Sequence, residues 1–298
     1  MKFRTEYKPE KSVLTLNPGV PAVLAGSCFS INIARKMDEH GWEAVNPLST
    51  LYNPVSILEA IDMMSDLVNG SARFENSLFY GNDIWSSWWF DSSFSSVNRE
   101  DCREEFKIRQ NEFKTKLEEG KLLIITFGTS ICYYLCDENF PVGNCHKQPA
   151  ALFYRKRLTI EEIVEQWNQL ISKLQNKFKD LKIIFTVSPV RHLKDGFSGN
   201  SRSKAVLQLA VEEICGRNKD CFYFPAYEIL NDDLRDYRFY ASDLSHPSEE
   251  AIEYIWQKFL DTFIDSSGQQ LLEEGARHFK ALNHKPKLGA LNKPLKKG

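Results

Sequence analysis

The amino-acid sequence predicts an α/β fold in which helices cover both faces of a single parallel sheet. Five short apolar runs recur along the 298 residues, and segments with helical spacing separate them. The runs are continuously apolar rather than alternating, which is typical of strands buried on both faces. Strands that alternate with helices favour a parallel sheet. We therefore expect a three-layer α/β/α, flavodoxin-like domain with a five-stranded sheet.

Each predicted strand ends at small, turn-forming or polar residues. The strands are 23–25 before Gly26-Ser27, 43–45 before Asn46-Pro47, 122–127 before Gly128, 183–187 before Ser188-Pro189, and 221–224 before Pro225. Four further segments carry apolar residues at helical spacing: 31–40, 159–174, 203–215 and 248–264. Thr159 and Glu162 have the spacing of a capping box, which favours a helix start there.

One long region departs from this alternation. Residues 66–120 contain an aromatic cluster, followed by a charged helical stretch over 99–119. The cluster consists of Trp85, Trp88, Trp89 and Phe90. We interpret 66–120 as an insertion into one domain spanning 1–284, with the cluster as its anchor. The alternative is that these rings stack on sugars or line an acyl groove.

The end of the chain is rich in lysine, with proline and glycine but little apolar periodicity. We expect residues 285–298 to form a basic, flexible tail, and docking to an acidic surface is the alternative.

The composition argues against several classes of partner. With 38 Lys and Arg against 40 Asp and Glu, the formal charge is −2, which does not favour nucleic acid or anionic membranes. No apolar run approaches the roughly 18 residues of a membrane span, and the first residues lack the apolar segment of a secretory signal. We expect a cytoplasmic protein whose seven cysteines are free thiols. We expect no metal or organic cofactor.

Reactive side chains follow several of the predicted strands, at the sheet edge where ligands bind in parallel α/β folds. In chain order they are Ser27, the segment Gly128-Thr129-Ser130, the pair Arg191 and His192, and the pair Asp243 and His246. Since the carboxyl ends of parallel strands share one edge, these residues are candidates for a common site.

Ser27 is expected at a sharp strand-to-helix turn, which Gly26 permits. Such a turn exposes the hydroxyl and aims helix N-terminal amides at a developing oxyanion. A serine nucleophile needs a base, and that base needs an orienting acid. His246 and Asp243, three residues apart in a loop, are the right types for these roles. The alternative for Ser27 taken alone is a helix N-cap.

Several stretches of the chain resemble one family. Gly26-Ser27-Cys28-Phe29-Ser30 resembles the pentapeptide for which the GSCFA family is named, with Ser in place of Ala at the fifth position. Other matching stretches are 51–57, Asn144-Cys145-His146-Lys147, 188–192 and the Asp243/His246 block. Together they span about residues 20–265.

GSCFA proteins are similar to SGNH, or GDSL-like, hydrolases, which are three-layer α/β/α esterases and lipases. The resemblance implies that Ser27 is the nucleophile, His246 the general base and Asp243 its orienting partner. GDSL-like enzymes also carry a GxND block whose Asn helps to form the oxyanion hole, and Gly128-Thr129-Ser130 stands at that place here. Asn53 and Asn144 are candidates to replace that asparagine.

The remaining motifs leave alternatives open. His146 or Lys147 could bind an anionic substrate group, or their loop could pack under the insertion. A thiol nucleophile, Cys28 or Cys145, could pair with His146. For Arg191 and His192, substrate contact and a structural ion pair are both open.

These observations favour a serine esterase or deacylase that hydrolyses an acyl ester of a small molecule or carbohydrate, an acetyl ester among the candidates. The first alternative is a non-catalytic glycan- or peptide-binding protein on the same fold. The second is a cysteine-dependent acyltransferase.

Overall fold

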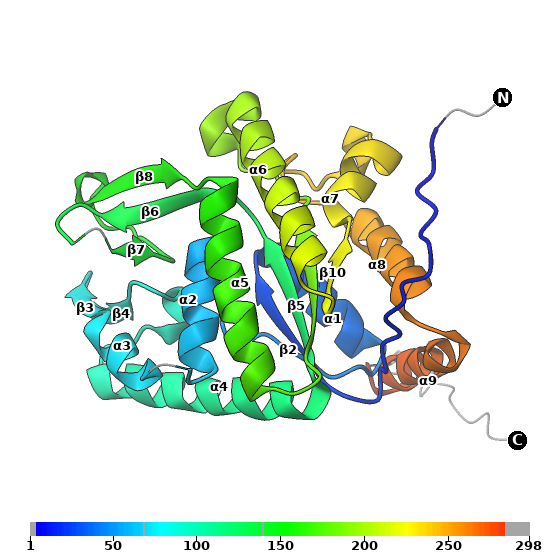
Figure 1. The fold of residues 1–298 in the computed structure, drawn as a ribbon, viewed down its shortest axis with the longest axis horizontal. Coiled ribbons are helices and arrows are strands. Elements are labelled where there is room, and N and C mark those ends of the chain that lie inside the picture. Colours follow the sequence, from blue (N-terminus) through cyan, green and yellow to red (C-terminus); the bar gives the residue numbers. More distant parts are fainter. Residues whose placement is uncertain (1–3, 68, 139, 284–298) are drawn as a thin grey trace, which may run out of the picture.

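The computed structural model describes residues 4–67, 69–138 and 140–283, and its centre is a five-stranded parallel sheet (Figure 1). The strands lie in the order β10-β9-β5-β1-β2, and every neighbouring pair is parallel. Their bounds are β1 Ala22–Gly26, β2 Ala44–Val45, β5 Leu122–Phe127, β9 Lys182–Val187 and β10 Cys221–Phe224. All five strands predicted from the sequence are confirmed.

When only the strands of this sheet are counted in chain order, β2-β1-β5-β9-β10 becomes the order 2-1-3-4-5 of the flavodoxin-like fold. The predicted fold class is therefore also confirmed. The connections change direction between β1 and β5, and at such a point a crevice opens beyond the strand ends. Ser27 follows β1 and Gly128 follows β5, so both lie at this point.

Helices cover both faces of the sheet because each strand buries alternate side chains on opposite sides. On β1, Val23 and Ala25 join one core cluster, while Ala22 and Leu24 join the other. The first cluster includes side chains from α2 Pro54–Met64, α4 Arg99–Gly120, α5 Ile160–Lys177 and α6 Gly196–Arg217. The second includes side chains from α1 Cys28–Glu39, α8 Glu249–Phe263 and α9 Ser266–Asn283.

The four predicted helices are present as α1, α5, α6 and α8. Thr159 caps α5 with the predicted capping box, in which Glu162 reaches back to the Thr159 amide. Helix α6 begins at Gly196, seven residues before the predicted start, in a stretch with two glycines that weakens helix propensity.

Residues 66–120 fold as α3 Gly70–Asn76, the hairpin β3 Leu78–Gly81 and β4 Ile84–Ser87, the short turn η1 Ser92–Phe94, and α4. Phe113 and Leu117 of α4 are fully buried in the same core cluster as Val23 of β1, so α4 belongs to a layer of the sandwich. The division into one domain over 1–284 with an insertion over 66–120 stays a prediction. The expected tail at 285–298 lies outside the described residues.

The aromatic cluster packs inside this region. Phe90 is fully buried and stacks on Phe94, and Trp88 stacks on Phe79 of the hairpin with ring centroids 3.6 Å apart. Trp89 is also buried and lies 4.5 Å from the ring of Phe140.

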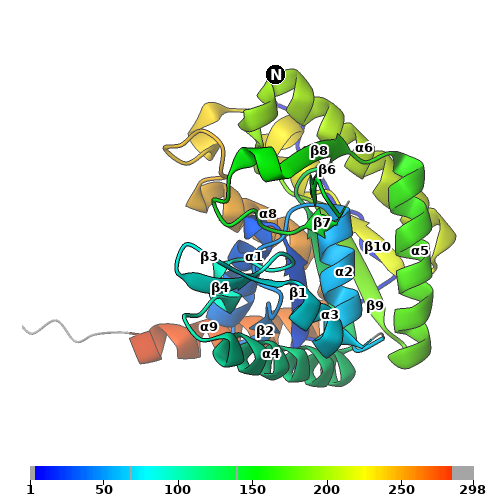
Figure 2. The ribbon, with the colours of Figure 1, turned by 90° about the vertical axis from the view of Figure 1, so that its left-hand side faces the viewer.

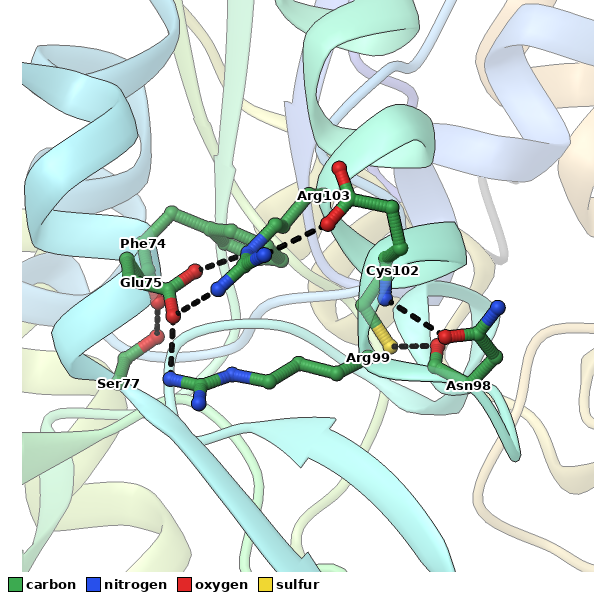
Figure 3. Close-up of polar contacts among 8 residues, drawn as sticks. Phe74, Glu75, Ser77, Asn98, Arg99, Cys102 and Arg103 are labelled. Carbon is green, nitrogen blue, oxygen red and sulfur yellow. Dashed lines mark hydrogen bonds and ion pairs between the residues drawn. The ribbon is translucent and has the colours of Figure 1, made fainter.

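Ion pairs fasten α3 to α4 near this cluster. Figure 3 shows the Glu75 carboxylate between Arg99 and Arg103 of α4, and its two oxygens each lie 2.6 Å from Arg103 nitrogens. Asn98 caps α4 by accepting from the Glu100 amide at 3.0 Å. These contacts fix α4 relative to α3.

The sequence did not predict a second, three-stranded antiparallel sheet in the order β7-β6-β8, which lies on the same side of the molecule as the β3–β4 hairpin (Figures 1 and 2). Its strands are β6 Ile131–Leu135, β7 Pro141–Val142 and β8 Phe153–Arg157. β8 is exposed and mostly charged, so the apolar signal of a buried strand is missing there, whereas β6 is an apolar run that the sequence analysis did not assign to a strand.

Helices α2 and α9 were likewise not predicted. Within the described residues, no helix has the length and apolar character needed to cross a membrane.

Candidate active site

Ser27 occupies the turn between β1 and α1 because the preceding residue is a glycine. Gly26 has φ of 128°, a conformation that side-chain-bearing residues rarely adopt. A Cβ on Gly26 would lie 2.1 Å from the Thr126 carbonyl oxygen on the neighbouring strand. The predicted sharp turn is therefore present, and only glycine fits its first position.

The Ser27 hydroxyl is unusual for a helix N-cap. Ser27 stands at the N-cap position of α1, but its side chain makes no capping hydrogen bond. The prediction that the turn exposes the hydroxyl is wrong: Ser27 is fully buried under its neighbours, and its Oγ has no hydrogen-bond partner among the described residues. A buried hydroxyl normally finds a hydrogen-bond partner, so the unpaired Ser27 Oγ is a candidate for a functional role.

Asp243 and His246 form a pair on the loop before α8. The Nδ1 atom of His246 lies 2.5 Å from Oδ2 of Asp243, and Oδ1 of Asp243 accepts the amides of Ser245 and His246. These amide donors, and then the imidazole, lower the pKa of Asp243 to about 2. The pair is exposed, with 46% of the His246 side chain and 50% of the Asp243 side chain accessible.

A cavity of about 390 Å³ opens at the carboxyl edge of the sheet. His246 lines it, together with Cys28, the residue after Ser27. The other lining residues are Tyr52, Asn53, Thr129, Ile131, Tyr133, Val142, Gly143, Asn144, Cys145, Val190, Arg191 and His192. The second sheet thus supplies one wall, and the strand ends of the main sheet supply the other.

His192 lies against the turn that carries Ser27. Its Nε2 atom is 3.2 Å from the position that a Cβ on Gly128 would take, and Ser27 Cβ is 3.3 Å from that same position. Nε2 is buried and makes no hydrogen bond within the described chain. Burial, followed by the charge of Lys204, lowers the pKa of His192 to about 4, so the ring is neutral at neutral pH.

Lys204 of α6 is a functional candidate that the sequence analysis missed. The residue is buried, and its Nζ donates to the carbonyls of Gly128 at 2.6 Å and Ser188 at 2.7 Å. Burial lowers its pKa to about 7. Its position in an amphipathic helix resembles that of a surface lysine, so no local pattern could have identified it.

The asparagine candidates are already engaged in local structure. Asn53 caps α2, accepting the Ser56 amide at 2.9 Å and donating through Nδ2 to Ser56 Oγ at 2.8 Å. Asn144 accepts the His146 amide at 2.8 Å through Oδ1 and lines the cavity.

His146 points away from the cavity and into the hairpin region. Its Nε2 lies 2.8 Å from the Ser87 carbonyl oxygen and 3.0 Å from that of Phe90, and a ring nitrogen between two carbonyls must carry the proton. Its ring packs on Phe79 and Trp88. These contacts agree with a packing role for the loop, and they leave His146 unable to activate Cys145.

Neither thiol in the cavity is activated. Burial raises the pKa of Cys28 and of Cys145, which disfavours the thiolate form in both cases.

Arg191 holds the loop that carries Asp243 and His246. Its guanidinium lies 4.0 Å above the ring of Tyr240, and its amide donates to the Ser245 carbonyl at 3.0 Å. In the described part of the chain it makes no ion pair.

Five of the candidates line one cavity: Asn53, Asn144, Arg191, His192 and His246. Asp243 is bonded to His246, while Ser27 and Gly128 do not line the cavity themselves but precede the lining residues Cys28 and Thr129. His146 instead points into the hairpin region. In the part of the chain that the structure describes, no three His, Cys, Asp or Glu side chains converge as a group that could hold a metal.

Comparison with known proteins gives one strong match. The model of the GSCFA family matches residues 21–259. No curated protein matches the chain. Among solved structures, a carbohydrate esterase family 3 protein from Talaromyces cellulolyticus is 8% identical, with a TM-score of 0.32, over 87% of this chain and 99% of that chain. A similarity at this score does not bear on the activity of the present protein.

Proposed function

The chain belongs to the GSCFA family, and from that premise we propose that it is a serine ester hydrolase with Ser27, His246 and Asp243 as its catalytic triad. The observation that carries the proposal is the Ser27 hydroxyl, which is buried at a helix N-terminus beside the cavity and has no partner among the described residues. In a serine that only capped its helix, this hydroxyl would accept a hydrogen bond from an amide of the first turn.

The reaction begins when Ser27 Oγ bonds to the ester carbonyl carbon and its proton passes to Nε2 of His246. The carbonyl π electrons move onto oxygen, and the tetrahedral intermediate then collapses. The C–O bond to the alcohol breaks, and the alcohol leaves with the proton held by His246. Water attacks the acyl-enzyme by the same route, so the acid is released and Ser27 recovers its proton.

The pair on the loop is suited to the base role. Asp243 holds Nδ1 of His246, which leaves Nε2 for proton transfer and stabilises the imidazolium that forms. Among the described residues, no hydrogen bond joins His246 to Ser27. Such contacts are often long in unliganded enzymes and tighten in the substrate complex.

The cavity favours a small substrate. Its volume of about 390 Å³ is at the lower end for small-molecule sites, and its wall combines apolar side chains such as Val190 with a few polar groups. We propose an acyl ester of a small molecule or carbohydrate, processed by one domain over 1–284.

The test compares Ser27→Ala with Thr159→Ala, a substitution at another N-cap. Thr159 does cap its helix, so its loss should cost about 1 kcal/mol of unfolding free energy and leave ester hydrolysis intact. Ser27→Ala loses no capping bond, so it should keep its stability while hydrolysis of an acyl-ester panel and labelling by a fluorophosphonate probe disappear. Turnover by Ser27→Ala at the wild-type rate would refute the proposal.

The two alternatives give different results in the same assays. A binding protein would show no hydrolysis and no labelling even in the wild type. A cysteine-dependent acyltransferase would lose activity in Cys28→Ala or Cys145→Ala and on treatment with iodoacetamide. We expect both variants to retain hydrolysis, because both thiols have raised pKa values.

A further inference from the structure

The backbone amides that commonly form an oxyanion hole are occupied at this site. The Ser27 amide donates to the Thr126 carbonyl at 3.1 Å. The amides of Gly128 and Thr129 both donate to the Tyr52 carbonyl, at 2.7 and 3.0 Å. These three amides are therefore engaged, so a side-chain donor beside Ser27 would supplement the first-turn amides of α1 in stabilising the oxyanion.

His192 carries a donor nitrogen in the right place. Its Nε2, which is a donor in the tautomer that carries the proton there, lies 3.2 Å from the position of a Cβ on Gly128, and Ser27 Cβ lies 3.3 Å from the same position. The absence of a side chain at Gly128 leaves this space open. Nε2 is buried and has no hydrogen-bond partner in the described structure, although a buried ring nitrogen costs free energy when it is unpaired.

The ring is held in this position by its surroundings. The His192 amide donates to Asn200 Oδ1 at 2.9 Å, and the ring packs edge-on against Tyr52 with centroids 5.6 Å apart. Beneath it, the buried Nζ of Lys204 holds the carbonyls of Gly128 and Ser188, at the ends of β5 and β9. Lys204 thereby fixes the Gly128 backbone that His192 faces.

The two histidines of the cavity have opposite environments. His246 is exposed and has the Asp243 carboxylate on its Nδ1. His192 has no carboxylate bonded to either ring nitrogen in the described residues, and burial and the charges of Lys204 and His246 oppose its protonation, against a weaker opposite effect of Asp195. A ring that resists protonation is a poor base but a stable neutral donor.

We propose that Nε2–H of His192 donates a hydrogen bond to the oxyanion formed when Ser27 attacks the ester, in the place of the asparagine of GDSL-like enzymes. This inference rests on the proposed function. His192 keeps its proton throughout: the Ser27 proton goes to His246, and the oxyanion is stabilised by the hydrogen bond and by the positive end of α1. Lys204 acts as a positioning residue.

The first experiment compares His192→Leu with His192→Gln, because both side chains approximate the size of histidine and only glutamine places an N–H near the Nε2 position. We expect His192→Leu to lose about 10²–10³-fold in kcat with little change in KM, the effect of losing one oxyanion donor. We expect His192→Gln to recover most of that loss, with the acidic limb of its pH–rate profile unchanged, because His246 still acts as the base.

A tetrahedral inhibitor provides a second measurement. An alkylboronic acid that bonds to Ser27 mimics the charged intermediate, so its affinity should fall in His192→Leu by the same factor as kcat/KM. A structural role for His192 would instead change the melting temperature without this proportionality. Should His192→Leu fail to fold, the pH profile and inhibitor affinity of His192→Gln decide the matter.

Three outcomes would overturn the inference. The first is wild-type kcat in His192→Leu. The second is a His192→Gln enzyme that folds but is as inactive as His246→Ala, which would make His192 the base. The third is a 10²-fold loss in Asn144→Ala beside an unimpaired His192→Leu, which would assign the donor to Asn144. The proposed function fails separately, through undiminished turnover in Ser27→Ala.

Discussion

The two sides of the cavity each contain a histidine, and the surroundings of the two imidazole rings differ. On the exposed side, the loop before α8 gives His246 an ionised carboxylate at 2.5 Å and access to water. On the buried side, His192 packs on Tyr52 and lies near the ammonium of Lys204, and no carboxylate is bonded to its ring within the described chain. The same imidazole is therefore suited to carry a proton on one side and to remain neutral on the other.

This difference suggests a division of labour. Proton transfer needs a group whose cation is tolerated, whereas charge stabilisation needs a fixed dipole in a site that water does not reach. The exposed loop provides the first, and the buried strand ends provide the second. The following substitutions test each side in turn.

Substitution of Asp243 should have the largest effect. Asp243→Asn leaves the size of the side chain unchanged but removes the charge that orients His246, so kcat should fall by about 10⁴-fold. Asp265→Asn is the matched control, because Asp265 is also an exposed aspartate that accepts a backbone amide, from Gly268 at 2.8 Å, and it lies outside the cavity. Steady-state ester hydrolysis measures both, and equal losses in the two variants would contradict a special role for Asp243.

Filling the space between Ser27 and His192 should have the next largest effect. In Gly128→Ala, the new methyl would lie 3.0 Å from the Tyr52 carbonyl oxygen as well as close to Ser27 and His192, so kcat/KM should fall on the order of 10²-fold. Gly216→Ala is the control: its Cβ meets nothing within 4 Å, and helix propensity should raise its stability by roughly 0.5–1 kcal/mol. Full activity in Gly128→Ala would show that the reaction does not use this space.

Lys204 makes stability depend on pH in a definite direction. Its folded pKa of about 7 lies below its ordinary value of 10.5, so between these values the unfolded chain binds more protons. Stability from this group therefore rises with pH across that window. From about pH 7 to about pH 9, wild type should gain roughly 2 kcal/mol relative to Lys204→Met in urea unfolding. Parallel pH profiles for the two proteins would contradict a buried, titrating Lys204.

The smallest effect is expected at the ion pairs of Figure 3, outside the cavity. Glu75→Gln weakens the contacts with Arg99 and Arg103, which are partly exposed, so the free energy of unfolding should change by less than about 1 kcal/mol. Hydrolysis should be unchanged, because these residues do not line the cavity. A large loss of activity would show that the 66–120 region positions the site.

The sequence supplied the five sheet strands because double burial forces a continuous apolar run, which is a local signal. It missed β8 because that strand is mostly charged and exposed. It missed β6 although Ile131–Leu135 is an apolar run, because no helix follows it in the pattern of the other strands. Because these strands were not predicted, the sequence analysis also missed one wall of the cavity.

The residues of the site also fall into two groups, those predicted from local sequence and those that only the tertiary structure identifies. Ser27 and Gly26, and likewise Asp243 and His246, depend on neighbours within three residues, so the chain pattern alone predicted a turn and a pair that the structure contains. The roles of His192 and Lys204 depend on Gly128, which lies 76 residues from Lys204 along the chain. Local spacing is written in the sequence, but burial and the absence of a partner arise only when distant segments pack together, so only the tertiary structure distinguishes the two histidines.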